Sequence, residues 1–168
     1  DPYGKPVGMW DIMAANTCFL QYPLSYLRAR EGWISMDEIT AAGEYTLTAV
    51  DGEGGSKVFA IKTPMAESDS EYICVEYRRK NTDLNGFEYS VPGTGLIMYR
   101  VDTKVTDQTN GSGENYIYVY RSGETSPGSG INDDGIASAV LGNVGSSYGS
   151  LDLSKPSTED TLYYSNGN

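Results

Sequence analysis

The chain has 168 residues and a formal net charge of −11, and it contains no histidine. The negative charge opposes binding to nucleic acid and to anionic lipid surfaces, and no apolar run is long enough to span a membrane. The missing histidine excludes Ser-His-Asp and Cys-His catalytic pairs, and histidine-held zinc, within this chain. We therefore expect neither nucleic acid nor membrane as a partner.

The first unusual segment is VGMWDIMA at residues 7–14. Its bulky apolar side chains surround a single carboxylate, Asp11, and their order fits neither the spacing of an amphipathic helix nor the alternation of a strand. Taken alone, Met13 in this segment is typical of a methionine that fills a core.

The next segment, PLSYLRAREGW at residues 23–33, predicts the one convincing helix of the chain, at about 24–31. Pro23 suits the first turn, where its missing N–H is not needed. Arg28 and Arg30 lie in the last turn, where cations interact favourably with the helix dipole. Gly32 is placed to end the helix in a left-handed conformation.

Residues 44–102 predict strands. EYTLTAV (44–50) alternates apolar and polar residues, DGEGGSK (51–57) is rich in turn formers, and VFAIKT (58–63) follows, so we expect a hairpin. EYICVEYRR (71–79) and GLIMYRV (95–101) are apolar on both faces, as central strands are.

Residues 103–168 hold half of the 20 glycines and predict loops between short strands, NYIYVYR (115–121) and DTLYYS (160–165). The predicted fold class is α+β and mostly β, an antiparallel sheet or two packed sheets with one short N-terminal helix. We treat 1–168 as a single region with three parts: 1–43 with the apolar segment and helix, 44–102 with the strand core, and 103–168 as a loop-rich β tail.

Two pairs of charged residues lie within the apolar strands. Glu76 and Arg78 are two residues apart and share one face of their strand, and Arg100 and Asp102 do the same in the other strand. Buried charges must be paired. If the strands are neighbours, the four residues predict a structural cross-strand charge network rather than a catalytic site.

A calcium loop and a disulfide are the remaining candidate features. NDDG (132–135) is acidic and ends in glycine, but Ile136 and Ser138 do not continue the alternating ligands of a calcium loop, so we expect a solvated turn. Calcium binding therefore stays without support. Cys18 and Cys74 allow either one disulfide or two buried thiols.

Taken together, VGMWDIMA, PLSYLRAREGW, EYTL, YICVEYRRKNTD and GTGLIMYRVD resemble one protein family in order and spacing. They are similar to the second half of the catalytic domain of secreted bacterial zinc metallopeptidases of the immune inhibitor A type. The resemblance covers residues 7–102, and the tail matches only loosely. It implies that Met13 is the methionine of a methionine turn, an apolar floor under the metal site, with Trp10 and Ile12 packed around it. Asp11 would hold the turn through backbone hydrogen bonds.

The zinc of this family is held by an HExxH motif and a further acidic residue, all N-terminal to the methionine turn. None of these histidines is present here. The resemblance therefore implies a fragment of a larger metallopeptidase domain, with no catalytic residue and no metal ligand of its own. Zinc would belong to the full-length parent, which would be secreted or at the bacterial cell surface. The partners would be the N-terminal half of the domain and, for the parent, an extracellular protein substrate.

Two alternatives remain open. A β-rich binding module would use some of the 14 tyrosines to bind extracellular protein or carbohydrate. A decayed homologue would lack zinc ligands even in its full-length form and retain the scaffold for binding. The residues encoded upstream of this chain separate these alternatives from the peptidase.

Overall fold

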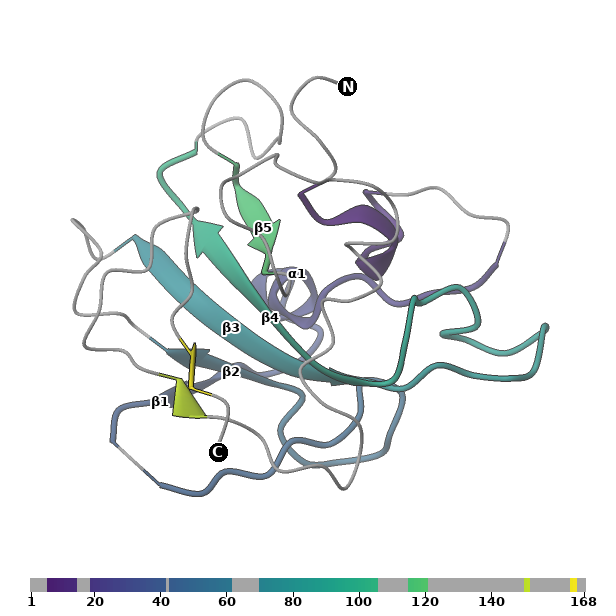
Figure 1. The fold of residues 1–168 in the computed structure, drawn as a ribbon, viewed down its shortest axis with the longest axis horizontal. Coiled ribbons are helices and arrows are strands. Elements are labelled where there is room, and N and C mark those ends of the chain that lie inside the picture. The colour runs from purple at the N-terminus through teal and green to yellow at the C-terminus, as the bar shows by residue number, and fades with distance from the viewer. Residues whose placement is uncertain are drawn as a thin grey trace.

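The computed structural model describes residues 6–14, 19–41, 43–61, 70–105, 115–120, 150–151 and 164–165. Its helices are η1 (Gly8–Trp10) and α1 (Ser25–Arg30), and its strands are β1 (Asp37–Ile39), β2 (Val58–Ile61), β3 (Glu71–Arg78), β4 (Gly95–Asp102), β5 (Ile117–Val119), β6 (Ser150–Leu151) and β7 (Tyr164–Ser165). The first five strands form one sheet in sequence order, and β6 pairs with β7 (Figure 1). The expected β-rich fold with one short α-helix near the N-terminus is confirmed. No helix within the described ranges is long and apolar enough to cross a membrane.

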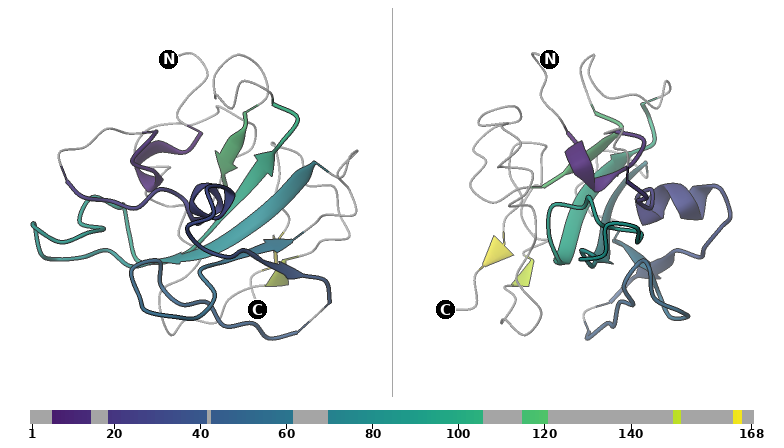
Figure 2. Two further views of the ribbon diagram at one scale, coloured as in Figure 1. Left: turned by 180° about the vertical axis from the view of Figure 1, so that it is seen from behind. Right: turned by 90° about the vertical axis from the view of Figure 1, so that its right-hand side faces the viewer.

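The sheet lies between two different layers. In the right-hand view of Figure 2, α1 lies on one side of the sheet, and β6 and β7 lie on the other. The main core forms on the helix side and includes Trp10, Leu24 and Tyr99. A smaller core on the opposite side includes Ile73 and Met98. The two central strands are therefore covered on both faces, as their apolar sequences predict.

The sheet is mixed rather than purely antiparallel. β3 pairs antiparallel with β4 along its whole length, from Glu71 opposite Asp102 to Arg78 opposite Gly95. β2 and β5 add antiparallel strands on either side of this pair. β1 pairs parallel with β2, a contact that the sequence did not predict.

The hairpin expected between residues 44–50 and 58–63 is wrong. Residues 44–50 form no strand, and the segment makes isolated backbone hydrogen bonds, such as the one from the Thr48 N–H to the Ser56 carbonyl at 2.8 Å. The physical reason is that a strand has only two edges for pairing. Both edges of β2 are occupied, one by β3 and the other by β1.

Helix α1 begins and ends at the signals in its sequence. It starts two residues after Pro23 and ends just before Gly32, which has a φ of +76°. The Gly32 N–H donates to the Ala29 carbonyl at 3.0 Å, and the Trp33 N–H donates to the Arg28 carbonyl at 2.9 Å. Such bonds satisfy the last carbonyls of a helix that closes with a left-handed glycine.

Candidate functional site

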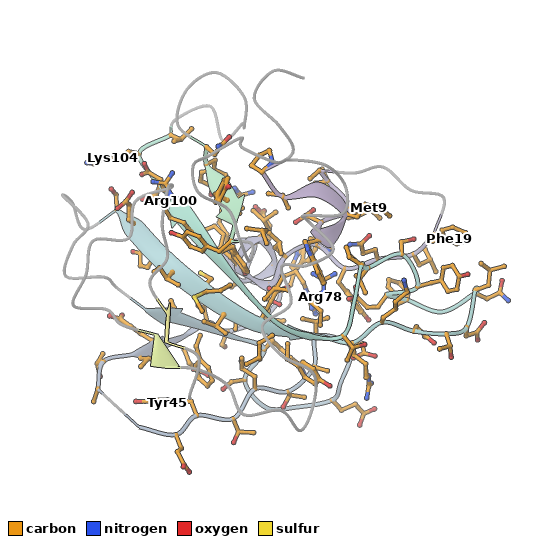
Figure 3. The ribbon with its side chains drawn as sticks, viewed as in Figure 1. Met9, Phe19, Tyr45, Arg78, Arg100 and Lys104 are labelled. Carbon is orange, nitrogen blue, oxygen red and sulfur yellow. The ribbon has the colours of Figure 1, made fainter. Side chains whose placement is uncertain are left out.

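The turn at residues 7–14 presents its side chains in two directions. Trp10 and Asp11 are buried, whereas 37% of Met9 and 80% of Met13 are exposed. Met9 lies at the outer side of η1 in Figure 3. Trp10 belongs to the main core on the helix side of the sheet. The expected packing of Trp10 around Met13 is therefore wrong, because the two side chains have opposite environments.

Asp11 holds this turn through its carboxylate, and its expected role in the turn is confirmed. Oδ1 accepts a hydrogen bond from the Met13 N–H at 2.6 Å, and Oδ2 accepts one from the Leu24 N–H at 2.8 Å. The first bond closes an Asx-type turn. The second joins the turn to the start of α1.

Arg78 lies at the centre of a buried polar cluster beneath the turn (Figure 3). Its Nε and Nη2 donate to the two carboxylate oxygens of Glu88 at 2.7 and 2.8 Å. Nη1 donates to Glu76 at 2.9 Å and to the Trp10 carbonyl at 3.0 Å, and Nη2 also donates to the Tyr22 carbonyl at 3.2 Å. All five N–H groups of the guanidinium are thus used.

The same cluster caps the N-terminus of α1. One oxygen of Glu76 accepts from the Ser25 N–H at 2.6 Å and from the Tyr99 hydroxyl at 2.9 Å. The Tyr99 hydroxyl oxygen in turn accepts from the Tyr26 N–H at 3.1 Å. Together with Asp11, which accepts from the Leu24 N–H, these side chains satisfy backbone N–H groups that the start of a helix leaves without a partner. We call Asp11, Glu76, Arg78, Glu88 and Tyr99 the Arg78 cluster.

The Arg78 cluster combines three carboxylates with one guanidinium in a buried place. Burial raises the pKa of Asp11 and of Glu88, although hydrogen bonds to both carboxylates act in the opposite direction. Burial also raises the pKa of the Tyr99 hydroxyl well above its ordinary value, so this group keeps its proton as a donor. Every member of the cluster is buried, and its charged groups bond to one another or to backbone groups that they hold in place.

Arg100 and Asp102 do not belong to this cluster, and the expected single network of four charges is wrong. Arg100 donates to Glu71 at 2.7 Å, and one carboxylate oxygen of Asp102 accepts from the Lys104 N–H at 2.9 Å. The register places Ile73 opposite Arg100, whereas Cys74 lies opposite Tyr99. Neighbouring residues of a strand point to opposite faces. The Arg100 pair therefore lies on the other side of the sheet from Arg78.

The described residues do not fit a zinc site. Within this part of the chain, no three histidine, cysteine, aspartate or glutamate side chains lie together as metal ligands would. Cys74 is a free, buried thiol, and burial raises its pKa far above the ordinary value. Cys18 and the NDDG segment at 132–135 lie outside the described residues.

Sequence reasoning missed Glu88 and Tyr99 as members of the cluster. Glu88 lies in a turn-rich connection between the two central strands, where no periodic pattern marks an inward side chain. The one available signal is Arg78 itself, because a buried guanidinium needs more than one acceptor partner.

Comparisons with protein-family models, curated proteins and solved structures find no match.

Proposed function

We propose that this chain forms the methionine-turn side of the catalytic domain of a secreted bacterial zinc metallopeptidase of the immune inhibitor A type. The full-length parent would hydrolyse peptide bonds of extracellular proteins. Four of the five segments that carry the resemblance contribute to one buried arrangement. VGMWDIMA supplies Asp11, PLSYLRAREGW supplies the capped helix, YICVEYRRKNTD supplies Glu76 and Arg78, and GTGLIMYRVD supplies Tyr99.

The observation that carries this proposal is the exposure of Met13 on an anchored turn. Its side chain is 80% exposed, yet its N–H is bonded to Asp11, and nearby Trp10 is bonded to Arg78 through its carbonyl. A large apolar side chain held outward on a fixed backbone is available to another protein surface. In the proposed parent, that surface is the N-terminal half of the domain, and Met13 forms the floor of the cleft between them.

The chain itself supplies no catalytic group in this proposal. It has no histidine, and the residues described here do not form a metal site. The zinc ligands and the residue that activates water would therefore come from the part of the parent that precedes the methionine turn. This chain would contribute the floor and one wall of the cleft.

The experiment that tests the proposal compares this chain with the complete product of its gene. We expect the reading frame upstream of Asp1 to encode HExxH, and the complete product to hydrolyse casein in a zinc-dependent way. The isolated chain should show no hydrolysis with added zinc. In the complete product, Met13→Ala should lower activity, whereas Leu84→Ala, which also truncates an exposed apolar side chain, is the matched control. An upstream sequence without histidines, or turnover by the isolated chain, would refute the proposal.

One observation favours the alternative of a binding module. Trp33, which follows α1, has 67% of its surface exposed, and an exposed indole ring can stack on a sugar. Tyr99 in β4 and Tyr118 in β5 are buried and cannot contribute to such a face. Binding of the chain to a glycan array that disappears in Trp33→Ala would establish this alternative, and a blank array would remove it.

A further inference from the structure

Arg78 joins two surface segments that are far apart in the sequence. Its Nη1 bonds to the Trp10 carbonyl in the turn at residues 7–14. Its Nε and Nη2 bond to Glu88, which belongs to the connection between β3 and β4 at residues 79–94. We call this connection the 79–94 loop. The guanidinium therefore contacts the turn on one side and the loop on the other.

Glu88 determines how the guanidinium is oriented. Its two oxygens bind Nε and Nη2 side by side, which is the bidentate geometry that fixes the plane of an arginine side chain. With the plane fixed, Nη1 is directed at Trp10 and Glu76. Without Glu88, the guanidinium keeps its bonds to Glu76 and to the Trp10 and Tyr22 carbonyls but loses the bidentate pair that fixes its plane, so the alignment of the bond to Trp10 is weakened.

A second route leads from Glu88 to the same turn. The Glu88 N–H donates to the Leu20 carbonyl at 3.0 Å, and one Glu88 carboxylate oxygen accepts from the Tyr22 N–H at 2.9 Å. Gln21, which lies between these two residues, donates from Nε2 to the Met9 carbonyl at 2.7 Å. Glu88 thus fixes the 20–22 segment, and that segment fixes the start of the turn.

The backbone of Glu88 is consistent with a residue held in place by these contacts. Its φ is 70°, in the left-handed region that side chains other than glycine rarely adopt. Among the described residues other than glycine, Glu88 is the one with a positive φ. A conformation of this kind persists where the surrounding contacts hold it, so losing the contacts allows the loop to relax.

We propose that Glu88 couples the 79–94 loop to the turn at residues 7–14, so that a displacement of the loop at Glu88 also displaces the turn. The coupling stands on the contacts of Arg78 and of the 20–22 segment, and it holds whether or not the chain belongs to a peptidase. The outer part of the loop carries Leu84 and Phe87, both exposed. A molecule that binds there and displaces Glu88 would also displace the turn that carries Met13.

The two tryptophans of the chain allow a direct test. The indole N–H signal of Trp10 in a ¹⁵N-labelled protein reports on the turn, and that of Trp33 reports on the segment after α1. Trp33→Phe assigns the two signals. We expect Glu88→Gln to shift or broaden the Trp10 signal and to leave the Trp33 signal in place.

Arg79→Gln is the matched control, because Arg79 begins the same loop but pairs with Asp51 at the surface, 2.8 Å away. It should leave both signals unchanged. If Glu88→Gln does not fold, Glu88→Asp keeps the charge and shortens the reach, and the same shift of Trp10 is expected. An unchanged Trp10 signal in a folded Glu88 variant overturns the proposal. An equal shift of both signals, which indicates general loosening, also overturns it.

Discussion

Replacing Arg78 with methionine removes five hydrogen-bond donors from a fully buried site but keeps most of the side chain's length. The variant leaves the carboxylates of Glu76 and Glu88 without their counter-charge and two backbone carbonyls, of Trp10 and Tyr22, without this donor. Breaking a buried ion pair by removing one partner typically costs about 3–5 kcal/mol. Since domains of this size unfold with about 5–15 kcal/mol, we expect Arg78→Met to lose a large part of the stability at pH 7.

Urea unfolding followed by tryptophan fluorescence measures this loss. The matched control is Arg79→Met, because 54% of the Arg79 side chain is exposed and its pair with Asp51 lies at the surface, where such pairs contribute about 0–1 kcal/mol. If Arg78→Met does not fold, Arg78→Lys, which keeps the charge but not the fork geometry, should show an intermediate loss. Equal losses for the Arg78 and Arg79 variants would refute the view that the buried cluster holds the fold together.

Three further predictions follow from the same contacts. Burial raises the pKa of Asp11 and of Glu88, so at these sites the folded chain binds protons more tightly than the unfolded chain. Their contribution to stability is therefore largest at acid pH and is lost as the pH rises through the raised values, and Asp11→Asn should flatten this dependence in unfolding measurements. Tyr99→Phe removes a donor to Glu76 and an acceptor at the helix start, and it should lower the free energy of unfolding by about 1–3 kcal/mol. Cys74 is buried with a raised thiol pKa, so peptide mapping should show iodoacetamide labelling of Cys74 only after unfolding.

The sequence was sufficient for the elements whose signals are local. Pro23 and Gly32 indicated where the helix begins and ends, and the observed α1 lies within the predicted range. The apolar runs at 71–79 and 95–101 predicted the two central strands, because only a strand covered on both faces can be apolar on both. The same pattern could not predict the register of these strands, and register decides which charges share a face.

What the sequence could not provide were contacts between distant segments. β1 occupies the edge of β2 at which residues 44–50 were expected to pair. The alternation in residues 44–50 cannot show that another segment takes this edge. Glu88 reaches Arg78 from a loop whose composition predicts only turns. Asp11 was different, since a lone carboxylate in an apolar turn must accept hydrogen bonds from nearby N–H groups, and the Met13 N–H is close in sequence.

The central claim of this account is that Met13 is an exposed side chain on a rigid turn. Hydrogen exchange of the Met13 amide, measured together with the rate of Met13 oxidation by dilute peroxide, tests both parts at once. The bond from the Met13 N–H to Asp11 predicts slow amide exchange, and the 80% exposure predicts rapid oxidation of the thioether. Rapid exchange would show that the turn is not held, and slow oxidation would show that the side chain is covered. Either result would contradict the account.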